Sequence, residues 1–231
     1  MTFFLDRWAC WTAQDSPDGV PALDFLPSRT RKRMSSLSRI VMHVGHSLLE
    51  GTQVNDVVFA SRFGEITRQL TVTEGLIEED EVTPTNFSYS VFNTPVAVLS
   101  LTEGLEGITR AVYAGERSLA QGLMQSILIL ASGAAERLLF IMADEKVPDF
   151  YREIAGGSDS AAGAVGFVLS KDGGGNGWWG TISLHDGDRE ASSSPMTPAD
   201  IGSRLGAGDG SDEMVIPGDG FYVLLHRDGG R

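Results

Sequence analysis

The stretch GITRAVYAGERSLAQG, residues 107–122, decides the fold. Its first part, Gly107 to Tyr113, predicts a β-strand, the following Ala-Gly pair predicts a sharp turn, and the apolar residues after it predict a long helix over Glu116–Ser132. Many acyl-transfer enzymes display their nucleophile at the turn of such a strand–turn–helix unit. At this turn the chain has a glutamate, and its single cysteine, Cys10, lies far upstream.

Predicted helices and strands alternate on both sides of this unit. Apolar residues at helical spacing predict helices over Met34–Glu50, Ile66–Ile77 and Asn93–Leu105. Short runs rich in aliphatic and aromatic residues predict strands over Asp56–Ser61, Arg137–Ala143 and Gly163–Ser170. This alternation predicts an α/β fold in which a sheet is layered with helices.

We expect one domain over residues 1–231. Residues 1–30 contain several prolines and predict an irregular N-terminal segment, residues 31–170 predict the core, and residues 171–231 are rich in glycine. Two segments of this tail, WWGTISL (178–184) and GFYVLLH (220–226), have the composition of strands. The tail is therefore expected to complete the sheet.

Composition limits the classes of function. The chain is 42% hydrophobic and 21% charged, as in ordinary soluble globular proteins. The formal net charge of -13 argues against nucleic-acid binding, because phosphate contacts need a basic surface. The apolar runs are too short to span a membrane, and the acidic Asp6 near the start argues against a signal peptide. Since one cysteine forms no internal disulfide, the cytoplasm is the expected location.

Two charge clusters stand out. The basic residues Arg29, Arg31, Lys32 and Arg33 precede a predicted helix. They predict either a solvated turn or a docking point for an acidic partner such as a carrier protein. The acidic segment IEEDE, residues 77–81, predicts an exposed loop.

Common cofactor and catalytic motifs are missing from the sequence. It has no P-loop, no GxGxxG after a strand and no GxSxG elbow, so no cofactor is expected. His43 and His46 lie three residues apart on a predicted helix, but no third ligand accompanies them, so no metal is expected. Ser118 follows the turn without an evident base, which favours a structural role at the helix start.

Three consecutive segments resemble the amino-terminal half of a β-ketoacyl synthase, a condensing enzyme of the thiolase fold. They are PTNFSYSVFN (84–93), NTPVAVLSLTEGLEG (93–107) and the strand–turn–helix unit over 107–133. The resemblance extends over about residues 30–170 and implies a mixed sheet layered with helices, truncated relative to a full condensing enzyme. In this register the catalytic cysteine is replaced by Glu116. The catalytic histidine pair has no counterpart, because His185 and His226 lie in unrelated turns.

The resemblance therefore implies an inactive subunit, similar to the chain-length factors that pair with an active ketosynthase in aryl polyene biosynthesis. In such pairs the strand resembling Gly107–Tyr113 runs antiparallel to its counterpart across the dimer axis. The implied interface residues are Gly107, Ile108, Thr109, Arg110, Ala111, Val112 and Tyr113. The segment resembling Phe87–Phe92 helps to close the acyl tunnel of the partner. Its bulky side chains, Phe87, Tyr89 and Phe92, are either tunnel residues or core aromatics.

Other interpretations remain open at the level of sequence. The chain could be a free-standing homodimeric scaffold of a polyketide pathway, or a malonyl decarboxylase or acyl hydrolase that uses Glu116 or Ser118. Glu116 could also be an ordinary acid at a helix start, with Arg110 or Arg117 as its ion-pair partner. An acyl carrier protein is expected to bind mainly through the partner subunit.

Overall fold

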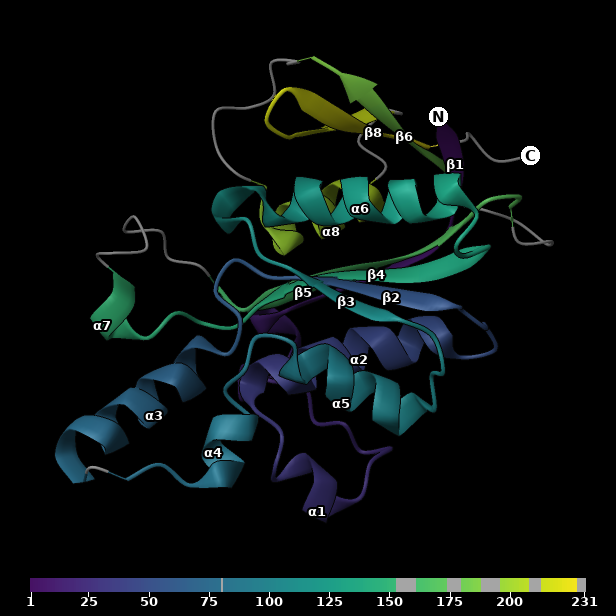
Figure 1. Ribbon diagram of the computed structural model, residues 1–231. Helices are drawn as coiled ribbons and strands as arrows, with labels where there is room; N and C mark the ends of the chain where they lie inside the picture. Colours follow the sequence, from purple (N-terminus) through teal and green to yellow (C-terminus); the bar gives the residue numbers. More distant parts are fainter. Residues whose placement is uncertain (80, 153–160, 174–179, 188–195, 208–212, 228–231) are drawn as a thin grey trace.

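The computed structural model describes residues 1–79, 81–152, 161–173, 180–187, 196–207 and 213–227. Its strands form one eight-stranded mixed sheet in the order β3-β2-β4-β5-β1-β6-β8-β7, with helices on both sides (Figure 1). The predicted class, a mixed sheet layered with helices, is confirmed.

One half of the sheet contains three parallel strands. These are β2 (Asp56–Ala60), β3 (Thr109–Val112) and β4 (Arg137–Asp144), with β2 in the middle. All five residues of β2 are buried, as expected for a strand covered on both faces. The antiparallel strand β5 (Gly163–Ser170) follows β4 and is also buried throughout. The edge strand β3 pairs with β2 alone, so its outer edge is free in the described sheet.

Two helices form the layer below the sheet in Figure 1, α2 (Ser36–Leu49) and α5 (Thr94–Glu103). Ser35 caps α2, because its side chain accepts a hydrogen bond from the Ser38 backbone N–H at 2.9 Å. Three more helices lie further out on this side of the molecule. They are α1 (Ser28–Arg31), α3 (Ile66–Glu79) and α4 (Pro84–Ser88), while α7 (Asp149–Arg152) follows β4.

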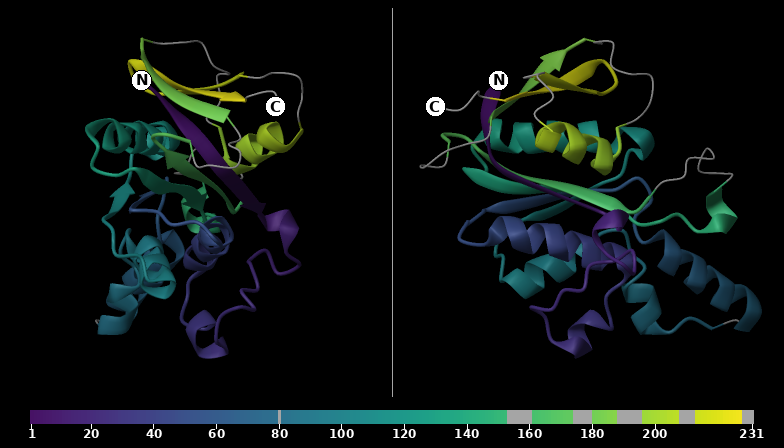
Figure 2. Two further views of the ribbon diagram at one scale, coloured as in Figure 1. Left: turned by 90° about the vertical axis from the view of Figure 1, so that its right-hand side faces the viewer. Right: turned by 180° about the vertical axis from the view of Figure 1, so that it is seen from behind.

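The helix after the turn, α6 (Ser118–Ser132), is enclosed between two parts of the sheet. It packs against β2 and β4 on one side and contacts β6, β7 and β8 on the other. With α8 (Pro198–Ala207) it forms the layer above the main sheet (Figure 2). The covering strands are β6 (Gly180–Asp186), β7 (Glu213–Pro217) and β8 (Phe221–Arg227). Trp178 and Trp179, which belong to a predicted strand, lie outside the described residues.

The N-terminus differs from the irregular segment predicted for residues 1–30. Strand β1 (Thr2–Thr12) lies in the middle of the sheet between β5 and β6, and is followed by the short helix η1 (Ala13–Asp15). The sequence pattern does not predict this strand, because charged residues interrupt its apolar alternation. Asp6 pairs with Arg137 at 3.2 Å, while Arg7 donates hydrogen bonds to carbonyls at the end of α2, at a shift in register of the strand.

The predicted acidic loop at residues 77–81 is also wrong in part. Helix α3 continues to Glu79 and includes the first three of these residues. Glutamate is a good helix former, so the acidic run extends the exposed helix instead of ending it.

Candidate functional site

The strand–turn–helix unit has the predicted order, with one additional turn. After β3, the 3₁₀ turn η2 (Gly115–Arg117) leads into α6. Gly115 has a φ of 52°, a conformation that favours glycine. Ser118 accepts a hydrogen bond from the Ala114 N–H at 3.0 Å and lies 2.8 and 2.9 Å from the carbonyls of Gly115 and Ser61. It is fully buried, so its hydroxyl holds the turn to the loop after β2.

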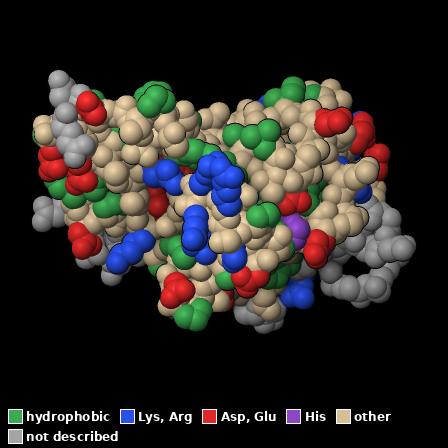
Figure 3. Space-filling model, turned by 90° about the horizontal axis from the view of Figure 1, so that it is seen from below, with side chains coloured by type: hydrophobic (Ala, Val, Ile, Leu, Met, Phe, Trp, Pro, Cys, Tyr) green, Lys and Arg blue, Asp and Glu red, His purple; other side chains and the backbone are tan. Residues whose placement is uncertain are grey.

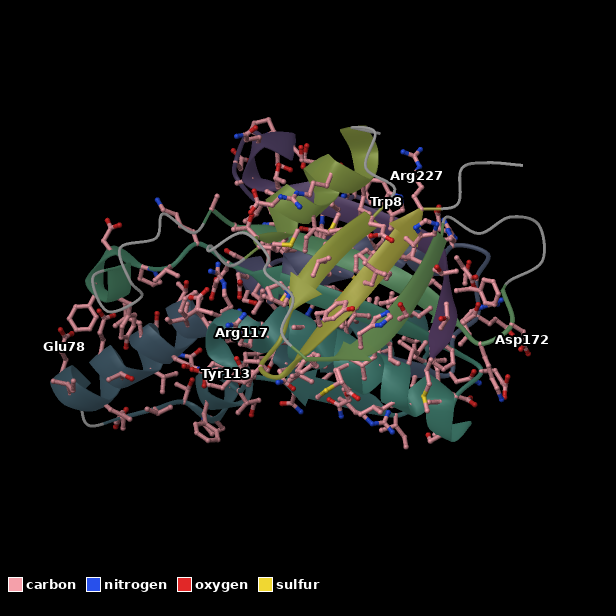
Figure 4. The ribbon with its side chains drawn as sticks, turned by 90° about the horizontal axis from the view of Figure 1, so that it is seen from above. Trp8, Glu78, Tyr113, Arg117, Asp172 and Arg227 are labelled. Atoms are coloured by element: carbon pink, nitrogen blue, oxygen red, sulfur yellow. The ribbon has the colours of Figure 1, made fainter. Side chains whose placement is uncertain are left out.

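Glu116, which the sequence resemblance predicts to replace the synthase cysteine, is half exposed and forms an ion pair with Arg62 at 3.6 Å. The partners predicted from sequence are wrong. Arg110 pairs with Asp56 at 2.6 Å, and Arg117 pairs with Asp219 at 3.2 Å. Figure 4 labels Tyr113, just before this turn, and Arg117, its last residue, well away from Glu78 at the outer end of α3.

Arg62 is the residue beside this turn that the sequence did not indicate. It follows β2, and its guanidinium Nε lies 2.7 Å from Oδ2 of Asp144, the last residue of β4. The other oxygen of Asp144 accepts hydrogen bonds from the Arg62 backbone N–H and the Ser61 hydroxyl, both at 2.8 Å. Arg62 and Asp144 are 8% and 1% exposed. The two residues thus form a buried ion pair that holds the guanidinium beside the turn, where Glu116 contacts it.

A second carboxylate cluster lies beside the first, again on the segments that follow β2 and β4. Glu65 is fully buried, and one of its oxygens accepts hydrogen bonds from Ser35 at 2.6 Å and Ser38 at 2.9 Å. Its other oxygen has no hydrogen-bond partner among the described residues and lies 3.9 Å from Arg68. Burial raises the pKa of Glu65.

Glu145, which directly follows Asp144, is 2% exposed and accepts a hydrogen bond from the Thr67 backbone N–H at 3.0 Å. Burial, with a further contribution from the charge of Glu65, raises the pKa of Glu145 from 4.5 to about 7. A groove of about 350 Å³ adjoins this cluster. It is lined by Met34, Ser35, Ser36, Thr67, Arg68, Thr71, Val72, Asn86 and Glu145.

The three predicted tunnel aromatics have different environments. Phe87 is 60% exposed, and so its ring is available to another molecule. Tyr89 lies under the guanidinium of Arg68, 5.3 Å from its ring centre. Phe92 packs within the chain, with ring-centre distances of 5.7 Å to Phe59 and 5.8 Å to Tyr113. Phe92 is half-buried and packs against the core, which is one of the two environments expected for these aromatics.

The predicted interface strand lies at the free edge of the sheet. The apolar residues directly before and directly after β3 are exposed, Ile108 at 60% and Tyr113 at 68%. Within β3, Thr109 and Ala111 are also exposed, whereas Arg110 and Val112 are half-buried. Gly107 lies so close to the Asn55 carbonyl that a Cβ atom would be 1.2 Å from its oxygen. Only glycine fits there, and this contact fixes the start of the strand.

The histidines lie apart from this turn in the described structure. His46 bonds to Glu103 at 3.0 Å, and His185 stacks on Tyr222 with 4.9 Å between ring centres. Among the described residues no group of three or more His, Cys, Asp or Glu side chains is arranged to hold a metal ion. In the same part of the chain, no helix is both long and apolar enough to cross a membrane.

Solved structures with the same fold identify the class. A chain of the ketosynthase ApeO in complex with its chain length factor ApeC from Xenorhabdus doucetiae superposes with a TM-score of 0.78 at 24% identity, covering 98% of this chain and 100% of that one. A chain of the ishigamide ketosynthase/chain length factor gives 0.77 at 12% identity, covering 99% and 100%. The ketosynthase from module 6 of the bacillaene synthase of Bacillus subtilis gives 0.58 at 11%, covering 84% of this chain but 42% of that one.

These likenesses define a protein with the fold of the amino-terminal half of a ketosynthase. No curated protein sequence matches the chain. The family model for the β-ketoacyl synthase N-terminal domain matches residues 8–204, which is most of the chain. The chain therefore belongs to the β-ketoacyl synthase family, as the sequence resemblance predicted.

Proposed function

We propose that this chain is a non-catalytic, chain-length-factor-like subunit that pairs with an active β-ketoacyl synthase and shapes its acyl tunnel in a polyene or fatty-acid type of biosynthesis. The observation that carries the proposal is the glutamate at the turn where the sequence resemblance predicts the synthase nucleophile. A carboxylate, Glu116, occupies the start of the buried helix and is engaged by Arg62. A carboxylate at this position cannot form the thioester that a condensing enzyme needs.

The remaining nucleophiles do not compensate for this loss. The chain's one cysteine, Cys10, lies on β1, where Gly202 of α8 packs close to its sulfur. Burial raises the pKa of the Cys10 thiol, which keeps it in the less reactive protonated form. The Ser118 hydroxyl is engaged by backbone groups, so the hydrolase hypothesis lacks an activated serine.

Pairing with a partner is supported by the edge of β3. A free sheet edge flanked by exposed apolar side chains is a liability for a lone protein, because it invites association. Antiparallel pairing of β3 with a strand of another subunit would satisfy its outer backbone groups. Burial of Ile108 and Tyr113 would stabilise the complex by roughly 1.5–3 kcal/mol for each large apolar side chain that becomes fully covered.

The lengths of the related chains also support a partner-subunit role. The matched chains of the two ketosynthase and chain-length-factor structures are covered completely, whereas the bacillaene ketosynthase is covered by less than half. A chain of this length thus occurs in structures that contain both kinds of subunit. We infer the smaller, non-condensing role for the present chain, with the exposed ring of Phe87 as the first candidate for the wall of the partner's tunnel.

The proposal is tested by co-expression with the ketosynthase encoded nearest to this chain, followed by light scattering of the purified material. We expect a 1:1 complex, and we expect Ile108→Glu combined with Tyr113→Glu to weaken it at least about thirtyfold, as for loss of interface anchors worth ~2 kcal/mol or more. Ser203→Glu, at an exposed position on α8, is the matched control and should leave the complex intact.

Two outcomes would contradict the proposal. A stable homodimer that ignores the ketosynthase would favour the free-standing scaffold. A 1:1 complex that tolerates the double substitution would place the interface elsewhere on the chain. Thermal unfolding of each purified variant separates either outcome from a simple failure to fold.

A further inference from the structure

We propose that the groove beside the start of α3 binds a small organic cation, a primary ammonium group on a short apolar chain. The carboxyl groups of Glu145 and Glu65 supply the charge that holds it. With a volume of about 350 Å³, the groove is at the small end of the range for ligand pockets. It contains none of the residues at the edge of β3, so the inference does not depend on the proposed pairing with a ketosynthase.

A buried acid lies directly behind this groove. Glu65 is fully buried, and one of its oxygens accepts the hydrogen bond of Ser35. Its other oxygen, Oε2, lies 3.9 Å from Nε of Arg68 and has no hydrogen-bond partner among the described residues. Both Ser35 and Arg68 line the groove. A buried carboxylate oxygen without a donor is costly, so this position favours a ligand that brings N–H donors and a positive charge.

Glu145 presents a second carboxyl group to the same groove. It accepts a hydrogen bond from the Thr67 N–H and lines the groove together with Met34 and Val72, which offer apolar contact. We therefore place the ammonium group at the carboxyl group of Glu145, with the charge of Glu65 behind it. The apolar chain of the ligand then lies against the two apolar side chains.

Basic residues around the groove limit the charge of its ligand. Arg68 donates a hydrogen bond to the Arg33 carbonyl at 2.7 Å, and its guanidinium lies 5.3 Å from the ring centre of Tyr89. Lys32 and Arg33, directly before Met34, are exposed. The face seen from below, on which α1 lies, gathers Lys and Arg side chains in its middle (Figure 3). These charges repel a polyamine more strongly than a monoamine, so a ligand with a single ammonium group is favoured.

The affinity for such a cation should depend on pH. Burial is the main cause that raises the pKa of Glu145 to about 7, and the charge of Glu65 adds to it. The Thr67 hydrogen bond and the charge of Arg68 act in the opposite direction. A primary ammonium group stays charged up to about pH 10. Because this ligand favours the ionised form of Glu145, its affinity should be roughly tenfold higher at pH 8 than at pH 6.

The test is an NMR titration of the full chain with n-butylammonium chloride at constant ionic strength, followed at the Thr67 backbone amide. We expect a saturable shift, and we expect Glu145→Gln to weaken binding about tenfold or more. Glu74→Gln, which removes an exposed acid on α3, is the matched control and should bind like the natural chain. Butan-1-ol has the same apolar chain without the charge and should bind at least about tenfold more weakly. Urea denaturation checks that each variant is folded.

Several results would overturn the proposal. Equal weakening by Glu145→Gln and Glu74→Gln, or much tighter binding of spermidine than of n-butylammonium, would mean that the cation follows the general acidic charge of the chain. An affinity that falls as the pH rises would mean that protonated Glu145 donates a hydrogen bond, so that the groove takes an acceptor instead of a cation. Absence of a saturable shift would show that the groove does not bind this class of ligand.

Discussion

Two neighbouring carboxylate clusters follow the same pair of parallel strands, β2 and β4, and differ in how their charges are balanced. In the first cluster the buried Asp144 meets a buried cation, Arg62, and accepts two further hydrogen bonds from the loop after β2. In the second, the buried Glu145 lies near another buried acid, Glu65, and the nearest cation, Arg68, remains 3.9 Å from Glu65. One cluster pairs an acid with a base, and the other places an acid beside an acid.

This difference separates structural charge from titratable charge. A buried carboxylate that is paired with a cation and hydrogen-bonded to a loop holds the backbone around it in place. A buried carboxylate without a full partner favours its protonated form, so its charge depends on pH near neutrality. The first cluster therefore fixes the loop that reaches Glu116, whereas the second makes the start of α3 sensitive to pH.

The largest effect is expected for Asp144→Ala. This change leaves the buried guanidinium of Arg62 unpaired and removes the acceptor of the Ser61 hydroxyl. We expect the free energy of unfolding to fall by about 3–5 kcal/mol, measured by urea denaturation. Asp200→Ala, which removes an exposed acid on α8, is the control and should lower the free energy of unfolding by less. A loss under about 1 kcal/mol for Asp144→Ala would show that the ion pair between Arg62 and Asp144 does not hold this loop in place.

A smaller, pH-dependent effect is expected for Glu145→Gln. The folded-state pKa of Glu145, about 7, lies above its ordinary value of 4.5. The folded protein therefore holds this proton more tightly, and the resulting stability is fully present below pH 4.5 and is lost as the pH rises through 7. Glutamine keeps an acceptor for the Thr67 N–H without acquiring charge. We expect the variant to be more stable than the natural chain by roughly 1–3 kcal/mol at pH 8.

The control for this prediction is the pH series itself. Near pH 4.5 the natural chain and Glu145→Gln should have nearly the same free energy of unfolding, because Glu145 is then protonated in the folded state. A constant difference across the whole pH range would mean that the glutamine changed packing and not titration.

Coupling between the two acids predicts a third, smaller change. The charge of Glu65 helps to raise the pKa of Glu145, so Glu65→Gln should lower the pKa of Glu145. The measurement is an NMR titration of the Glu145 side-chain carboxyl carbon. Glu74→Gln neutralises an exposed acid on α3 and should leave that pKa almost unchanged. Equal shifts in both variants would point to the general charge of the protein instead of a local pair.

The contrast between the clusters also shows what the sequence could reveal. Apolar periodicity located β2, β4, β5 and α6 closely, because these elements are buried and their patterns are local. The position of Glu116 was predicted from the strand–turn–helix order. Its partner Arg62 was not, since pairing of the parallel strands β2 and β3 brings distant segments together and leaves no local signal.

Strand β1 was missed for a related reason. Its charged residues, Asp6 and Arg7, interrupt the apolar alternation that marks a strand. Their partners, Arg137 and the carbonyls at the end of α2, become apparent only after the sheet is assembled. The burial of Glu65 and Glu145 was missed as well, because a glutamate just after a strand is usually exposed.

The smallest effect on the fold is expected for Glu116→Ala, and it decides most about function. Glu116 is half exposed, and Arg62 keeps its stronger partner, Asp144, when Glu116 is removed. The free energy of unfolding should therefore change by less than about 1 kcal/mol. If the chain is a non-catalytic subunit, product formation by the co-expressed ketosynthase complex should also continue. Loss of product with an intact fold and an intact complex would contradict this expectation. Glu116 would then act on the substrate itself, and the pairing of an acid with Arg62 would be part of chemistry instead of structure.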